Sequence, residues 1–145
     1  MTKPDHLFQL YVDGAAKGNP GEAGIGAVVI DGEGNTVLRL SHYIGRATNN
    51  QAEYVGLIRG LEEVLDMGGK DVLVFTDSEL MEKQLAGEYR VKDSVLQGYH
   101  GRACRLLESF RSHRIEWIPR EENREADRLA SRAAMKKAGA RKGSV

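Results

Sequence analysis

Three short apolar segments lie near the start of the chain, and in the third of them apolar and polar residues alternate. They are residues 7–13 (LFQLYVD), 25–30 (IGAVVI) and 36–45 (TVLRLSHYIG). Segments of this length that are rich in β-branched and aromatic residues predict strands. The connections at residues 14–24 and 31–35 are rich in glycine and predict turns. The three strands are therefore expected to form an antiparallel meander.

The remainder of the chain alternates between helical spacing and two further apolar segments. Apolar residues recur at helical spacing over about 49–67, 78–86, 94–111 and 123–137. Residues 71–77 (DVLVFTD) are nearly all apolar, which is typical of a strand covered on both faces, and residues 114–119 (RIEWIP) predict a fifth strand. Trp117 and Ile118 in this last strand are expected to belong to the core. The predicted fold class is α/β, with a mixed five-stranded sheet (three antiparallel strands, then two parallel) and helices on both faces.

The length and composition indicate one globular domain over residues 1–145, with residues from about 138 to 145 as a flexible basic tail. No run approaches the ~20 apolar residues of a membrane span, and the first ten residues lack the apolar core of a signal peptide. The single cysteine, Cys104, has no intramolecular partner, which fits a reducing compartment. A cytoplasmic protein without membrane association is therefore expected, and the absence of heptads favours a monomer.

The net charge of 0 conceals an uneven distribution of charge along the chain. Residues 1–88 hold 7 basic and 14 acidic side chains, whereas residues 89–145 hold 14 basic and 7 acidic ones. Such a division fits a carboxylate site beside a phosphate-facing surface, although the charge alone favours two ordinary solvated surfaces.

Four acidic residues occupy positions where a site can form. Asp13 and Asp77 end apolar strands, and Glu53 and Asp127 share the inward stripe near the starts of two predicted helices. Each has a simpler explanation when taken alone, because acids are common in turns, as caps and at helix N-termini. If the two strands are neighbours, however, all four carboxylates converge. Such a cluster needs a cation, and oxygen ligands without Cys or His suit Mg²⁺ or Mn²⁺.

Hydrogen-bonding side chains accompany these acids. Residues 48–51 (TNNQ) precede Glu53 and exceed what one helix cap requires, so they suit a 2′-hydroxyl, a base edge or a phosphate. Residues 17–21 (KGNPG) could form a plain turn. Arginines recur at every fourth position near the end of the chain, at Arg120, Arg124, Arg128 and Arg132. This spacing fits a solvated helix face and a row of side chains directed at phosphates equally well.

These segments together resemble the type I ribonuclease H family. The resemblance rests on YVDGAAKGNPG around Asp13, TNNQAEY with Glu53, TDSELM with Asp77 and ENREADRLA with Asp127. All four motifs occur in order and span about residues 7–134. The resemblance implies a ribonuclease H-like fold and an endonuclease that hydrolyses the RNA strand of RNA/DNA hybrids, leaving 5′-phosphate and 3′-hydroxyl ends.

The same resemblance implies a role for each motif residue. The four acids would be catalytic and would hold two Mg²⁺ ions, with Mn²⁺ as a possible substitute and no small-molecule cofactor. Residues expected to contact the nucleic acid are Gly14, Lys17, Asn19, Thr48, Asn49, Asn50, Gln51, Arg120 and Asn123.

Two departures from the family pattern stand out. The segment WIPREENREAD lacks the longer loop with a histidine that many members carry, and Arg120 or Arg124 is expected to occupy part of that space. The segment EYRVKDSVLQGYHG holds only Arg90 and Lys92 where many members have a basic protrusion, which predicts weaker, salt-sensitive substrate binding. In its brevity the chain resembles the compact members of the family.

Two other functions would fit a related fold. A hybrid-binding module without cleavage is disfavoured because all four acids are present. A nuclease for duplex DNA is disfavoured because residues 48–51 suit 2′-hydroxyls, which DNA lacks.

Overall fold

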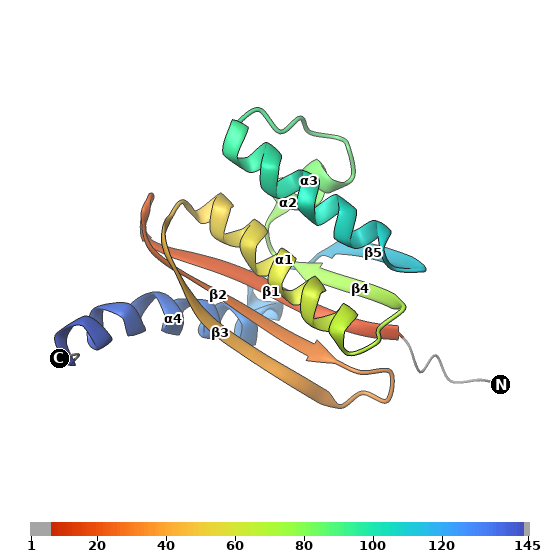
Figure 1. Cartoon of the computed structure of the whole chain (residues 1–145), viewed down its shortest axis with the longest axis horizontal. Helices are drawn as coiled ribbons and strands as arrows, with labels where there is room; N and C mark the ends of the chain where they lie inside the picture. The colour runs from red at the N-terminus through yellow and green to blue at the C-terminus, as the bar shows by residue number, and fades with distance from the viewer. Residues whose placement is uncertain (1–6, 144–145) are drawn as a thin grey trace.

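The computed structural model describes the backbone of residues 7–143 and the side chains of residues 7–135. Five strands form one sheet in the order β3-β2-β1-β4-β5 (Figure 1). The strands are β1 (Leu7–Gly18), β2 (Gly21–Ile30), β3 (Thr36–Ala47), β4 (Asp71–Thr76) and β5 (Ser112–Trp117). The helices are α1 (Asn49–Asp66), α2 (Glu79–Leu85), α3 (Ser94–Glu108) and α4 (Arg124–Gly143), with a short 3₁₀ turn η1 (Arg120–Glu122) before α4.

The strand pairing confirms the predicted mixed sheet. β2 is antiparallel to both β1 and β3, whereas β4 is parallel to both β1 and β5. Tyr11 of β1 lies opposite Phe75 of β4. Side chains alternate between the two faces of a sheet, and Asp13 and Asp77 each lie two residues beyond this pair. Their side chains are therefore expected at the same level and on the same face.

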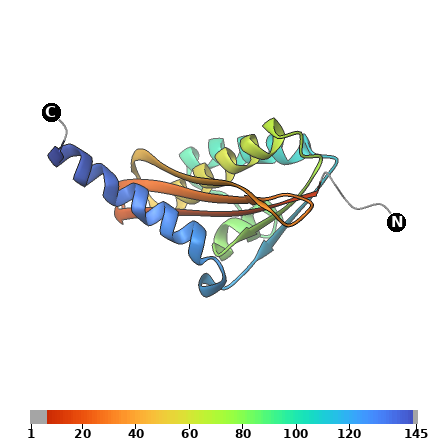
Figure 2. The ribbon, with the colours of Figure 1, turned by 90° about the horizontal axis from the view of Figure 1, so that it is seen from below.

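Helices cover both faces, as expected. α1 packs on β1 and β2 with α3 against it, and α4 packs on β1, β2 and β3 from the opposite side (Figure 2). The core between the sheet and α1 is built from alternating residues of β1 and the inner stripe of α1, including Leu10, Val12, Leu57 and Leu61, all fully buried. No helix within the described part of the chain combines the length and apolarity needed to cross a membrane.

The glycine-rich residues 14–24 form strands, so the predicted long turn is wrong. β1 continues to Gly18 and β2 begins at Gly21, with only two residues between them. Several of these glycines permit close helix packing instead of a turn. A Cβ at Gly24 would lie 2.6 Å from the Ala130 carbonyl oxygen, and a Cβ at Gly26 would lie 2.2 Å from that of Ala126. Glycine is needed here because the backbone of α4 rests directly on β2.

Two further predictions about the C-terminal half differ from the structure. Trp117 is 48% exposed, whereas Ile118 is buried as expected. β5 is the edge strand of the sheet, so Trp117 has a neighbouring strand on one side only. The last helix was predicted to end near residue 137 but continues to Gly143. Residues 144 and 145 of the predicted tail lie outside the described residues.

Candidate metal centre

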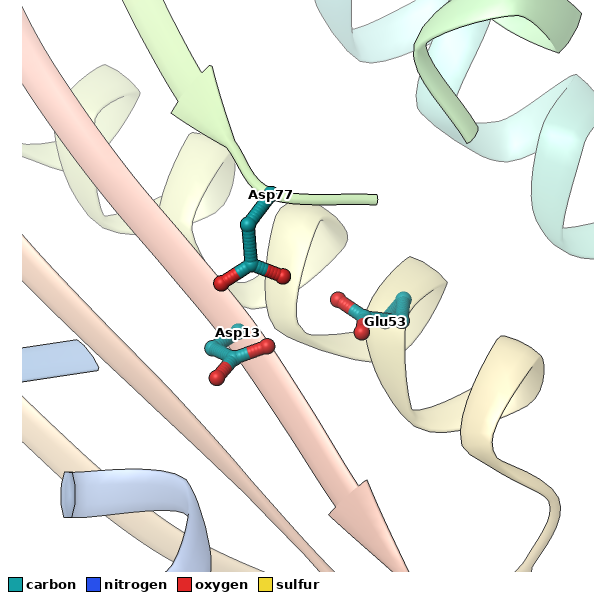
Figure 3. A group of neighbouring side chains, drawn as sticks. All are labelled: Asp13, Glu53 and Asp77. Atoms are coloured by element: carbon teal, nitrogen blue, oxygen red, sulfur yellow. The ribbon is translucent and has the colours of Figure 1, made fainter. Parts of the chain in front are cut away.

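Three carboxylates converge where β1 and β4 meet the start of α1. Asp13 lies on β1, Asp77 directly follows β4, and Glu53 lies in the first turns of α1. One oxygen of each lies within 4.8 Å of the others, and Figure 3 shows the three carboxylates facing a common point. The parallel pairing of β1 with β4 brings two of them together, and α1 supplies the third.

The position of Glu53 depends on how α1 begins. Thr48 caps the helix: its hydroxyl accepts a hydrogen bond from Gln51 N, and the Gln51 side chain accepts one from Thr48 N. The helix start then rests on β1 at Gly14, where a Cβ would lie 2.3 Å from the Ala52 carbonyl carbon and 2.5 Å from Glu53 N. The absence of a side chain at Gly14 therefore allows Glu53 to reach the other acids.

The cluster is electrostatically unfavourable without a cation. Burial and the neighbouring Asp77 charge raise the pKa of Asp13 from 3.8 to about 8. Burial and the Asp13 charge also raise the pKa of Glu53 well above its ordinary value. The pKa of Asp77 is raised as well, mainly by burial, although a hydrogen bond from Asn123 opposes this. Groups that resist ionisation in this way are characteristic of functional sites.

A hard divalent cation fits this arrangement. Glu53 Oε2 is buried and has no hydrogen-bond partner among the described residues. A buried carboxylate oxygen without a donor is costly, and a cation would satisfy it while neutralising its neighbours. The donors that meet here are all carboxylate oxygens, which suit Mg²⁺ or Mn²⁺ better than zinc.

Asp127 lies on the same cavity without belonging to the group of three. The cavity has a volume of about 550 Å³, and Asp127 in the first turn of α4 lines it together with Arg120. The Arg120 guanidinium lies 3.6 Å from Asp127 Oδ1 and is 77% exposed. Of the two arginines expected near the missing histidine loop, Arg120 therefore reaches the site, whereas Arg124 begins α4 and is not among the lining residues.

The amide side chains around the start of α1 have a defined orientation. Asn49 Oδ1 accepts from Ala16 N at 3.1 Å, and Asn19 Oδ1 accepts from Asn49 N at 3.0 Å. Gln51 Oε1 accepts from Thr48 N, as described above. Because a backbone N–H can only donate, each amide must present its oxygen to the backbone. Among the described residues no hydrogen bond from their NH₂ groups is found, so these groups can donate to another molecule.

The other predicted contact residues lie along the same surface. Gly14, Lys17 and Asn49 line the carboxylate cavity. An adjoining depression is lined by Asn19, Thr48, Asn50 and Gln51, together with Asp93 and Leu96. The hydrogen bond from Asn49 N to Asn19 Oδ1 connects residues of the two cavities.

The structure contradicts the predicted contact between Asn123 and nucleic acid. Asn123 is only 1% exposed, and its Nδ2 donates to Val12 O and to Asp77 Oδ2. Two other residues beside the acids were missed. Ser131 lines the cavity, and its spacing of one helical turn from Asp127 could have indicated it. Trp117 Nε1 donates to the backbone oxygen of Asp77, a contact that no sequence signal predicted.

The comparisons with known proteins agree with this site. Residues 11–133 match a family model described as "Reverse transcriptase-like". The chain is 46% identical over 135 residues to ribonuclease HI of Halobacterium salinarum, covering 92% of this chain and 68% of that protein. The chain belongs to the ribonuclease H family. The solved structure of LC11-RNase H1 in complex with an RNA/DNA hybrid is also similar, with a TM-score of 0.84, 41% identity and coverage of 90% of this chain and 99% of that one.

This ribonuclease H also resembles part of a longer protein. A bifunctional protein of Mycobacterium tuberculosis is 46% identical over 125 residues, which cover 86% of this chain but 34% of that protein. The relationship therefore concerns the ribonuclease H unit, and the remainder of the mycobacterial protein has no counterpart in the alignment.

Proposed function

We propose that this ribonuclease H is an endonuclease that hydrolyses the RNA strand of RNA/DNA hybrids and leaves 5′-phosphate and 3′-hydroxyl ends. The observation that carries the proposal is the convergence of Asp13, Glu53 and Asp77 beside the row of oriented amides. The similarity to LC11-RNase H1, whose solved structure contains an RNA/DNA hybrid, supports the same substrate class.

The proposed cofactor is a pair of Mg²⁺ ions, with Mn²⁺ as a substitute. Asp13, Glu53 and Asp77 would hold them, and Asp127 would complete the site from α4. Bound divalent cations would neutralise charge at the scissile phosphate and lower the pKa of the attacking water. Burial and the neighbouring charges raise the pKa of Asp13 and of Glu53, so protons and a bound cation would compete for these carboxyls.

The chain's own side chains would select the substrate. The NH₂ groups of Asn49 and Gln51 remain after their oxygens have accepted backbone donors, so they can donate to 2′-hydroxyls and base edges of the RNA. Lys17 lies on the cavity and could neutralise a phosphate. Asn19, Thr48 and Asn50 in the adjoining depression would contact the DNA strand. A cytoplasmic location and a monomeric state stay predictions from the sequence.

The test is cleavage of a labelled RNA/DNA hybrid with Mg²⁺, with Mn²⁺ and with neither, beside single-stranded RNA, duplex RNA and duplex DNA. Metal-dependent cleavage of the hybrid, with at least about 10-fold less of each other substrate, is the expected result. Binding of the hybrid without cleavage at any metal concentration would indicate a binding module. Equal cleavage of duplex DNA would show that the amides do not select RNA.

Arg120→Ala is expected to lower kcat for hybrid cleavage by roughly 10-fold. The exposed Arg120 guanidinium lines the cavity and can donate to a phosphate oxygen, whereas a guanidinium cannot itself act as a ligand of a divalent cation. Calorimetric Mn²⁺ binding should therefore change by less than about 2-fold. Arg114→Ala, at an exposed arginine of β5 that pairs with Glu116, is the matched control. An unchanged kcat for Arg120→Ala would exclude Arg120 from the reaction.

A further inference from the structure

We propose that Asn123 is a positioning residue whose side-chain amide connects β1 beside Asp13, and Asp77 at the end of β4, to the start of α4. The inference deepens the proposed function, since it concerns the geometry of the same site. Asn123 follows η1 and directly precedes α4, and its side chain lies beneath the site, out of reach of a substrate.

Three hydrogen bonds connect Asn123 to these three segments. Its Nδ2 donates to Val12 O at 2.9 Å, and Val12 directly precedes Asp13. The same Nδ2 donates to Asp77 Oδ2 at 3.1 Å. Its backbone oxygen accepts from Asp127 N at 3.1 Å. Asn123 therefore bonds directly to the carboxylate of Asp77, to the backbone of Asp127 and to Val12, the residue before Asp13.

The orientation of the amide is determined by its partners. A backbone carbonyl oxygen can only accept, so the atom facing Val12 O must be the NH₂ group. The other amide atom, Oδ1, is then directed elsewhere, and it is buried without a hydrogen-bond partner among the described residues. Rotating the amide would satisfy neither Val12 O nor an ionised Asp77.

Helix capping does not explain this arrangement. An asparagine before a helix ordinarily uses its side-chain oxygen to accept an N–H of the first turn. Asn123 has the position for this, yet its described side-chain hydrogen bonds run from Nδ2 to Val12 O and Asp77. A buried oxygen left unpaired costs stability, so the side chain is oriented for the site at the expense of the helix start.

The test compares Asn123→Ala and Asn123→Ser with wild type. Serine is a good helix cap and protects the start of α4, but its shorter side chain cannot supply both donors. Ser41→Ala is the matched control, because the Ser41 hydroxyl also ties the sheet to α4, donating to Leu129 O at 2.7 Å, without reaching an acid of the site. Three quantities are measured: Tm, Mn²⁺ binding by calorimetry without nucleic acid, and kcat and KM for the hybrid.

Both Asn123 variants are expected to weaken Mn²⁺ binding by about 10-fold or more and to lower kcat about 10-fold to 100-fold, with KM changed less than about 2-fold. Ser41→Ala should lower only Tm. Unchanged Mn²⁺ affinity in folded Asn123→Ser would overturn the proposal, as would a raised KM with unchanged kcat. The calorimetric measurement uses no nucleic acid, so it tests Asn123 even if the hybrid proves not to be the substrate.

Discussion

Asp13→Asn is expected to lower hybrid cleavage by at least about 10³-fold. Asp13 has a carboxylate oxygen within 4.8 Å of those of Glu53 and Asp77 and is 4% exposed, so its carboxylate faces the other acids and not bulk water. Asparagine has nearly the same shape but loses the charge and one of the two oxygen donors. Cation binding and catalysis should therefore fail together, while the fold is retained.

The measurement is single-turnover cleavage with Mg²⁺ and with Mn²⁺, beside calorimetric Mn²⁺ binding. Asp66→Asn is a matched control, because Asp66 is an exposed acid at the end of α1, far along the helix from Glu53. It should cleave like wild type. Cleavage by Asp13→Asn within about 10-fold of wild type would contradict the carboxylate site.

The same substitution is expected to stabilise the protein when divalent cations are absent. The pKa of Asp13 is raised from 3.8 to about 8 in the folded state, so between these values the folded state binds more protons than the unfolded state. The stability that this protonation contributes is present at low pH and is lost as the pH rises from about 4 toward 8. Asparagine carries no charge at any pH and should remove this loss.

At pH 8 without cations, Asp13→Asn should raise the free energy of unfolding by on the order of 2 kcal/mol relative to wild type. Urea unfolding at pH 5 and pH 8, with EDTA or with Mn²⁺, measures the effect. The difference should shrink at pH 5, where Asp13 is already protonated, and with Mn²⁺, which stabilises wild type by binding its folded state. An advantage of Asp13→Asn that grew toward low pH would show that the sign is wrong.

Gly14→Ala is expected to lower cleavage by about 100-fold or more and to destabilise the fold by about 1–3 kcal/mol. The added Cβ would lie 2.3 Å from the Ala52 carbonyl carbon and 2.5 Å from Glu53 N, which are backbone atoms that cannot move aside individually. The start of α1 must shift away from β1 and carry Glu53 with it. A displacement of about 1 Å is sufficient to disturb a site of this kind.

Gly98→Ala is the matched control. Gly98 lies on the exposed side of α3, and a Cβ there would meet nothing within 4 Å. Alanine should stabilise that helix by up to about 1 kcal/mol and leave cleavage unchanged. Cleavage and Tm of the two variants are compared under identical conditions. Wild-type cleavage by Gly14→Ala would show that the close approach of α1 to β1 is not required.

Much of the fold could be predicted because local pattern and final environment agree. The nearly continuous apolar run at residues 71–77 became β4, which lies between two parallel neighbours. The helical spacing of Leu57 and Leu61 marked the face of α1 that packs on the sheet. These signals are readable from sequence because burial of one face imposes a period of 2 on a strand and of 3.6 on a helix.

The four acids could be singled out for a different reason. The sequence places each at a predicted strand end or near a predicted helix start, and such ends tend to meet at one edge of a sheet. Asp13 lies within β1 instead, because that strand continues to Gly18. The capping of α1 by Thr48 and the proximity of residues 48–51 to Glu53 were likewise local features. Position along the chain was therefore enough to predict these residues as candidates for the site. It did not give the distances between their side chains.

Local patterns along the chain were sufficient to predict the order and type of the elements, the four carboxylates and the resemblance to a nuclease family. Features that depend on contacts between distant segments became visible only in the folded molecule. Only the packing of α1 and α4 on the sheet shows that a helix backbone rests directly on Gly14, Gly24 and Gly26. Only the contacts between distant segments show that Asn123 is buried against Val12 and Asp77. The folded structure also shows that Trp117 is half exposed. The reason is physical: a residue's burial and hydrogen-bond partners are set by neighbours far away in the chain, which local periodicity does not encode.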